Sequence, residues 1–230
     1  MGTASSPIII EGYGNDAALS ASYDTTNADV RVFATNASSY ITMKNLSIID
    51  GNTTGSGSAI YYYGGELILE GCTIEDNSTT KSSSVSGVSH DIYMYGNSHL
   101  VMLGTECNNG IYLYSSSATF GDDCLIGNDD NTLNAVIHMD NSSVTINASV
   151  MLFDSIYSDA NNPIVVGTAL TSHNNITGSQ ITISLSDYAS TKQIVSVSPD
   201  GGAVLSTEVQ KFILADSAYT LTSEGYLNSN

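Results

Sequence analysis

Positively charged side chains are scarce in this 230-residue chain. Five Lys and Arg residues stand against 23 Asp and Glu residues, which gives a formal net charge of −18. A protein that binds nucleic acid or an anionic membrane uses basic side chains to neutralise phosphate groups. The sequence therefore makes nucleic acid and anionic membranes poor partners, and we expect the acidity mainly to favour solubility.

Cysteine is also scarce, with Cys72, Cys107 and Cys124 as its three positions. An odd number of cysteines without a Cys-x-x-Cys pair is a poor basis for a disulfide framework or a zinc site. We expect all three to be small buried side chains.

Long apolar runs and helical periodicity are missing as well. No apolar stretch approaches the length needed to span a membrane, so we expect no membrane insertion by this segment. Charged residues make up 12% of the chain, which leaves few strong helix formers, and no segment keeps a 3.6-residue period. Very little helix is expected.

A repeat of about twenty residues organises what is present. Its clearest copy contains, in order, a strand at Ala59–Tyr63, a corner at Gly64–Gly65, a strand at Glu66–Glu70, a corner at Gly71, and a short strand at Cys72–Glu75 that ends at Asp76–Asn77. Further copies begin near residues 30, 91, 110 and 135. Cys72 and Cys124 fall at the same repeat position two coils apart, too far to bond directly.

Alternation within the first strand of each copy predicts which side chains face inward. Two more aliphatic columns are expected to point inward: Ile60, Ile92, Ile111 and Val136, then Tyr62, Met94, Leu113 and His138. The intervening columns are expected to point outward: Tyr61, Tyr93, Tyr112 and Ile137, then Tyr63, Tyr95, Tyr114 and Met139.

In-phase strands of this kind predict an all-β parallel β-helix, a single-stranded solenoid in which stacked coils supply the core. A sandwich of antiparallel hairpins ranks second, because the copies place the same residue types at the same corners. Coils are expected over residues 1–186, most regular over 30–152, with a last coil and a C-terminal capping segment over 187–230. Because a strand begins soon after Met1 with no leader, we expect a fragment of a longer chain.

The segment Gly57–Tyr61, followed by Leu67–Asn77, resembles the repeats of adhesin-like and polymorphic outer-membrane-protein-like β-helix proteins of bacteria. Those repeats carry Gly-Gly-Ala-Ile before a strand and a short apolar turn that closes on Asn; here Ser58 replaces the second glycine. Gly2–Gly12 is similar to early coils of right-handed β-helix polysaccharide lyases and their non-catalytic relatives. Lys211–Leu227 is similar to closing segments of gut-bacterial surface proteins. The resemblance implies a right-handed β-helix at or outside a bacterial cell surface, without implying an activity.

Catalytic signals are weak. Glycosidases of this fold need two carboxylates across the scissile bond, and the adjacent acidic pairs are Asp122-Asp123 and Asp129-Asp130. The Gly-His-Gly and Arg-Ile-Lys elements of polygalacturonase-like enzymes are absent, and the single arginine, Arg31, lies far upstream. Turn formation explains the acidic pairs more simply. A divergent polysaccharide lyase or glycosidase remains the alternative to a non-catalytic module.

Outward tyrosines form the candidate binding site. If the assigned facing holds, one face carries an aromatic strip, with Phe33 as an extension, made of Tyr61, Tyr63, Tyr93, Tyr95, Tyr112 and Tyr114. Such a strip could bind a glycan or a surface protein. Two simpler explanations compete: strand surfaces favour tyrosine, and the loop from Ser78 to His90 could cover the strip.

No cofactor is expected. Acidic loops at Asp122-Asp123 and residues 128–131 offer oxygen ligands that suit a structural calcium ion, but no established calcium-binding spacing occurs. The sequence therefore predicts an extracellular or cell-surface β-helix module that presents a rigid surface to a glycan or protein.

Overall fold

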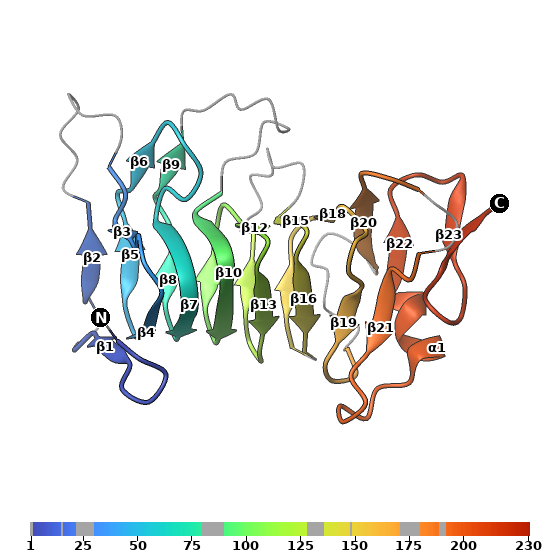
Figure 1. The fold of residues 1–230 in the computed structure, drawn as a ribbon, viewed down its shortest axis with the longest axis horizontal. Helices are drawn as coiled ribbons and strands as arrows, with labels where there is room; N and C mark the ends of the chain where they lie inside the picture. Colours follow the sequence, from blue (N-terminus) through green and yellow to red (C-terminus); the bar gives the residue numbers. More distant parts are fainter. Residues whose placement is uncertain are drawn as a thin grey trace.

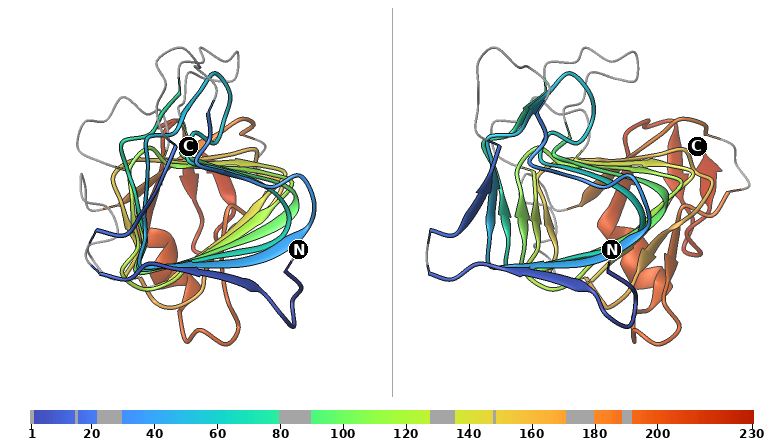
Figure 2. Two further views of the ribbon diagram at one scale, coloured as in Figure 1. Left: turned by 90° about the vertical axis from the view of Figure 1, so that its left-hand side faces the viewer. Right: turned by 60° about the vertical axis from the view of Figure 1, so that its left-hand side comes forward.

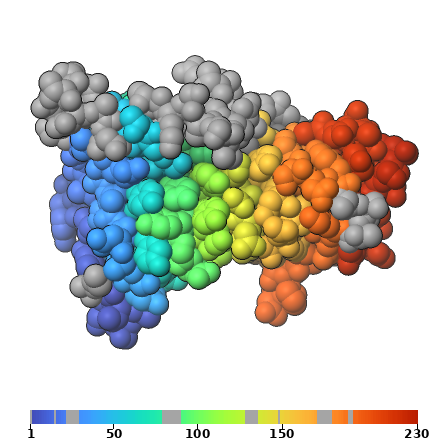
Figure 3. All heavy atoms as spheres, turned by 45° about the horizontal axis from the view of Figure 1, so that its top comes forward, coloured from blue at the N-terminus to red at the C-terminus, as the bar shows by residue number. Residues whose placement is uncertain are grey.

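The computed structural model describes residues 2–14, 16–21, 30–79, 90–127, 136–147, 149–170, 180–188 and 192–230. Successive coils stack along one axis, so that the N-terminus and the C-terminus lie at opposite ends of a rod (Figure 1). In the space-filling view, the colours follow one another along the rod in sequence order (Figure 3). Each coil therefore packs mainly on the coils just before and after it.

Three flat faces enclose the interior (Figure 2). The first face contains β3 (Phe33–Ala34), the first halves of β7 (Ile60–Glu70) and β10 (Ile92–Leu103), β12 (Ile111–Tyr114), β15 (Ile137–Asp140), β18 (Ile156–Ser158), β20 (Ile181–Leu185) and β22 (Phe212–Leu214). The second face contains β1 (Ile8–Glu11), β4 (Ser39–Lys44), the second halves of β7 and β10, β13 (Ser117–Phe120), β16 (Ser143–Ile146), β19 (Ile164–Val166) and β21 (Val195–Val197). The third face contains β2 (Ala18–Ser20), β5 (Ser47–Ile49), β8 (Thr73–Ile74), β11 (Glu106–Cys107), β14 (Leu125–Ile126) and β17 (Met151–Leu152).

Parallel pairing between successive coils holds the faces together. Because β7 and β10 continue through a corner, the first two faces form one 14-stranded sheet, whereas the third face is a separate six-stranded sheet. A small side pair joins β6 (Asn52–Thr53) to β9 (Ser78–Thr79), also in parallel. The chain winds right-handed, as crossovers between parallel strands do (Figure 2). The fold is a parallel β-helix, and the antiparallel sandwich is wrong.

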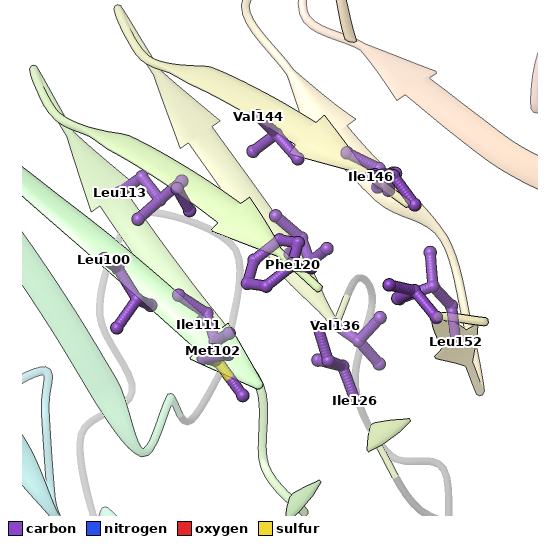
Figure 4. Packing of buried hydrophobic residues seen from close by; sticks show 14 of the residues in the cluster. Leu100, Met102, Ile111, Leu113, Phe120, Ile126, Val136, Val144, Ile146 and Leu152 are labelled. Atoms are coloured by element: carbon purple, nitrogen blue, oxygen red, sulfur yellow. The ribbon is translucent and has the colours of Figure 1, made fainter. Parts of the chain in front are cut away.

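In the coils that begin near residues 59, 91 and 110, the expected inward columns fill the interior. Ile60, Ile92 and Ile111 occupy one row of the register and have no exposed surface. Tyr62 is equally buried, and its hydroxyl group donates within the core to the carbonyl oxygens of Ser39 or Glu66, at 2.8 and 2.7 Å. Figure 4 shows how apolar side chains from the faces meet in the interior. Burial of stacked aliphatic side chains is the main stabilising contribution.

The fourth coil differs from the expectation by one residue. Ile137 pairs with Ile111 and Met139 pairs with Leu113, so these two side chains point inward. His138 pairs with Tyr112 and belongs to an outward column. The expected alignment of Val136 with Ile111 and of His138 with Leu113 is therefore wrong. A shift of one residue exchanges the two faces of a strand, and here burying Ile137 and Met139 favours the observed register.

The corner between the first and second faces combines left-handed backbone with buried hydroxyl groups. Positive φ angles recur there at Asn97 (60°), Ser115 (47°) and Asn141 (48°). The next residue in each coil is a buried serine, and these serines hydrogen-bond from coil to coil. Ser116 Oγ accepts from the Ser98 amide at 3.3 Å, and Ser142 Oγ accepts from the Ser116 amide at 3.1 Å. This serine ladder satisfies backbone groups that the bend removes from the sheet.

The three cysteines are free and buried, as expected. Register on the third face aligns Thr73, Glu106 and Leu125, which places Thr105 between Cys72 and Cys124. These thiols are small side chains of the core.

A short helical segment and a hairpin close the C-terminal end. Helix α1 (Leu205–Glu208) runs into a 3₁₀ turn at Val209–Lys211 and then into β22. The antiparallel pair β23 (Tyr219–Leu221) and β24 (Leu227–Ser229) follows, and Gly225 in its connection has a φ of 75°. The segment expected to cap the C-terminal end therefore closes with an antiparallel hairpin. No helix in the described part of the chain has the length and hydropathy that a membrane span requires.

Candidate binding surface

The six tyrosines form one continuous surface on the first face, here called the tyrosine strip: Tyr61, Tyr63, Tyr93, Tyr95, Tyr112 and Tyr114. Register places Tyr61, Tyr93 and Tyr112 in one row and Tyr63, Tyr95 and Tyr114 in the next. Tyr63 is 38% exposed and Tyr114 is 45% exposed, whereas the other four rings are half-buried. The expected outward facing is therefore confirmed for these six tyrosines, whereas Ile137 and Met139, the last members of the two expected columns, point inward.

Contacts between the rings explain why Tyr61, Tyr93 and Tyr95 are half-buried. Tyr61 and Tyr93 stack with centroids 5.2 Å apart and planes 25° apart, and Tyr93 and Tyr95 stack at 5.5 Å and 29°. Tyr95 also lies 4.8 Å from both Tyr61 and Tyr63, in tilted arrangements. Rings stacked in this way cover each other's faces. The inner part of the strip therefore presents ring edges and hydroxyl groups to its surroundings.

The outward row continues beyond Tyr112 into coils where no aromatic extension was expected. The His138 ring lies 4.4 Å from the Tyr112 ring, and Tyr157 stacks on His138 at 4.3 Å. His138 was not expected here, because the alignment of its coil from the sequence was shifted by one residue and placed it in an inward column. Tyr157 was not expected because it lies in a coil whose copy of the repeat is too degenerate to recognise. At the other end, the Arg31 guanidinium lies 4.7 Å from the centre of the Tyr61 ring.

Phe33 does not extend the strip. It pairs with Ile60 in the inward row, whereas Ala34 lies opposite Tyr61. Phe33 packs against the core as a partly buried side chain. The expectation for Phe33 is wrong because the upstream copy of the repeat is degenerate, so its register could be assigned only from the pairing.

His90 covers part of the row. Its ring lies 5.4 Å from Tyr112 and 5.9 Å from His138, and both histidines are only 3% exposed. Burial lowers the pKa of His90 to about 3 and also lowers the pKa of His138. Both imidazoles are therefore neutral at physiological pH. His90 ends the loop that was expected to cover the strip, and residues 80–89 of that loop lie outside the described residues.

Hydroxyl groups and two carboxylates set the polarity of the strip. Burial raises the pKa of Tyr93 and of Tyr95 to about 12, so these phenols stay protonated and able to donate. The Tyr112 hydroxyl lies 3.4 Å from Oδ2 of Asp140. The pKa of Tyr112 is raised mainly by burial and secondly by the negative charge of Asp140. Asp140 and Asp159 follow the paired residues Met139 and Ser158. Negative charge is therefore concentrated at the C-terminal end of the row.

A polar groove of about 260 Å³ lies beside the strip at the corner between the first and second faces. Its lining is made of uncharged hydroxyl and amide side chains: Asn97, Ser98, Ser115, Ser116, Ser117, Asn141, Ser143 and Asn162. Tyr114 immediately precedes Ser115, so the aromatic row and the groove adjoin. The groove itself offers uncharged hydrogen-bonding groups, and the Asp140 carboxylate stands where the row meets the groove, because Asp140 pairs with Tyr114 and precedes Asn141.

The acidic residues singled out for catalysis or calcium do not form a site in the described ranges. Asp122 and Asp123 are exposed on a turn, and Asp123 has a φ of 59°, which fits the turn interpretation. Asp129, Asp130 and the rest of residues 128–131 lie outside the described residues. Among described residues, no group of three or more His, Cys, Asp or Glu side chains could hold a metal ion.

No family model matches the chain, and no curated protein or solved structure matches it. The resemblance to adhesin-like β-helix repeats therefore stays a prediction. Any functional inference rests on the geometry of the tyrosine strip and its neighbouring groove.

Proposed function

We propose that this chain is a non-catalytic, adhesin-like module of a cell-surface or secreted bacterial protein, and that the tyrosine strip binds a carbohydrate. The main observation that supports this proposal is that six tyrosines on three successive coils face outward. Tyrosine combines an apolar ring with a hydrogen-bonding tip, which suits the mixed surface of a sugar.

The arrangement of polar groups supports a neutral glycan as the ligand. Ring edges and protonated phenol groups of the inner strip offer apolar contact and hydrogen bonds, and the adjoining groove adds Asn and Ser side chains. Asp140 and Asp159 make the C-terminal end of the row unfavourable for uronates or sialic acids. Tyr63 and Tyr114, as the most exposed rings, are the residues expected to contact the sugar most extensively.

The rigidity of the tyrosine strip is a second feature that supports carbohydrate binding. The strip stands on strands that pair in register on both sides, so ring positions are set by the stacked coils rather than by a loop. A ligand that binds a preorganised surface loses less free energy to ordering of the protein. The mechanism is therefore presentation of a fixed pattern of rings and hydroxyl groups, with no bond made or broken.

Binding of the fragment to a glycan array tests this proposal. A Tyr63→Ser/Tyr114→Ser double variant is compared with Tyr13→Ser, which removes a tyrosine that is 88% exposed but lies outside the strip. We expect the double variant to lose at least tenfold in affinity and the Tyr13 variant to bind like the wild type.

Three other results would contradict the proposal. Wild-type binding to no glycan would refute carbohydrate recognition and direct the search to a protein partner or a structural role. Equal loss in the double variant and in Tyr13→Ser would place the site elsewhere. Cleavage of a bound glycan would establish the alternative, a divergent polysaccharide lyase or glycosidase of the β-helix type.

A further inference from the structure

The densest ring contacts in the strip converge on Tyr95. Its ring centroid lies 4.8 Å from Tyr61, 4.8 Å from Tyr63 and 5.5 Å from Tyr93. Tyr61 and Tyr63 belong to β7, and Tyr93 and Tyr95 belong to the next coil, β10. Two adjacent coils are therefore joined by a cluster of four phenol rings. Carbohydrate binding does not require such close ring-to-ring packing.

We propose that this cluster is a site of oxidative modification, at which Tyr95 forms an intramolecular dityrosine crosslink with Tyr61 across two coils. The inference is independent of carbohydrate binding. Dityrosine joins two phenol rings through carbons adjacent to the hydroxyl-bearing carbons. The ring centroids of Tyr61 and Tyr95 lie 4.8 Å apart, so the two phenol rings are in contact, and after burial the interaction with the Tyr61 side chain raises the pKa of Tyr95. Tyr63, at the same centroid distance from Tyr95, is the competing partner.

Access and packing favour reaction within one molecule. Tyr63 is 38% exposed, so an oxidant can reach the edge of the cluster, and the ring contacts connect it to Tyr95 and then to Tyr61. A tyrosyl radical formed at any of the four rings therefore lies within contact distance of another phenol. An isolated exposed tyrosine such as Tyr13 can meet a second ring only by encounter with another molecule.

The chemistry balances with a peroxide and a haem peroxidase as the one-electron oxidant. Each phenol loses one electron and one proton to give a phenoxyl radical. The two radicals couple to form a carbon–carbon bond, and the hydrogen on each coupled carbon moves to the oxygen as the rings regain aromaticity. The protein loses two hydrogen atoms in total, and one hydrogen peroxide molecule takes up two electrons and two protons to become two water molecules.

The crosslink would connect residue 61 to residue 95 and close the intervening chain into a loop. Closing a loop lowers the conformational entropy of the unfolded chain and so stabilises the folded chain. In a solenoid this staple would lock two neighbouring coils that otherwise depend on their shared interface. We expect the crosslinked protein to unfold at a higher temperature than the untreated protein.

The test treats dilute purified protein with hydrogen peroxide and a haem peroxidase, and measures dityrosine fluorescence of the monomer fraction. Peptide mapping by mass spectrometry locates the crosslink through the loss of two hydrogen atoms between the Tyr61 and Tyr95 peptides. We expect Tyr95→Phe to lower the monomer dityrosine yield at least tenfold. Tyr114→Phe is the matched control, because Tyr114 is exposed and has no stacked ring partner among the described residues.

Two results would overturn the proposal. One is dityrosine found only in covalent dimers, which would indicate encounter between molecules. The other is a Tyr95→Phe variant whose monomer yield equals that of the wild type or of Tyr114→Phe. Because Tyr95→Phe keeps the ring, the fold is expected to persist, and matching thermal unfolding curves before oxidation verify it. A crosslink mapped to Tyr63 and Tyr95 would refute the choice of Tyr61.

Discussion

Oγ of Ser58 lies 3.0 Å from Oδ1 of Asp91 and donates a hydrogen bond to a carboxyl group that has no exposed surface. Asn109, one coil further on, also donates to Asp91, from its backbone amide and from its side chain at 3.2 Å each. Three successive coils therefore meet at this carboxyl group. Burial outweighs these hydrogen bonds and raises the pKa of Asp91 to about 7.

The free energy of unfolding is expected to decrease as pH rises, because of Asp91. Below its ordinary pKa of 3.8 the group is protonated in both states, and the folded state keeps its full stability. As pH rises towards about 7, the unfolded chain releases this proton first, so stability decreases by up to about 1.4 kcal/mol per pH unit. Asp91→Asn removes this contribution. Urea unfolding from pH 4 to pH 8 should show a smaller decrease in the variant, and equal slopes would contradict the assignment.

The C-terminal cap is expected to depend on the ion pair between Lys211 and Glu208. Nζ of Lys211 lies 2.9 Å from Oε2 of Glu208, a side chain that is 2% exposed, and the same oxygen accepts from the Leu170 amide at 2.9 Å. Lys211→Met leaves the buried carboxylate unpaired, which should cost about 2 kcal/mol or more. Adding Glu208→Gln should recover part of the loss. Chemical unfolding of both variants checks this, and a double variant less stable than the single one would refute the pairing argument.

The serine ladder is expected to stabilise through its buried hydrogen bonds. Ser116 Oγ accepts from the Ser98 amide and donates to the Tyr114 carbonyl oxygen at 3.0 Å. Ser116→Ala leaves the Ser98 amide buried without this acceptor and should cost about 1–3 kcal/mol. Ser143→Ala, at a half-buried position that faces outward, is the control and should change stability by less than about 0.5 kcal/mol. Similar losses in both variants would show that the ladder contributes little.

Two glycines with positive φ angles should respond differently to alanine. Gly65 has a φ of 79°, and an added Cβ would lie 2.0 Å from the Ser39 carbonyl oxygen in the adjacent coil. Gly104 has a φ of 52° and nothing within 4 Å of an added Cβ. Gly104→Ala should therefore cost about 1 kcal/mol from backbone strain alone, and Gly65→Ala several times as much. Thermal unfolding compares them, and equal shifts would contradict a steric conflict at Gly65.

The amino-acid sequence by itself determined the architecture. Alternation of period two in Ile60–Tyr63 and in the matching segments assigns an inside and an outside to each strand, and Gly64–Gly65 and Gly71 mark the bends. Repetition of that pattern requires stacking, because one coil cannot bury its own apolar side chains. The outward facing of all six tyrosines follows from the same alternation.

The tertiary structure decided the details that depend on neighbouring coils. The stretch Val136–Met139 holds apolar residues at both alternating positions, so only pairing with β12 shows that His138 faces outward. The contact of His90 with Tyr112 and His138 joins residues from three coils. The stacking of Tyr61 on Tyr93 likewise needs the position of the next strand. Periodicity along one chain fixes the side on which a residue lies, whereas register and ring orientation arise from packing between coils.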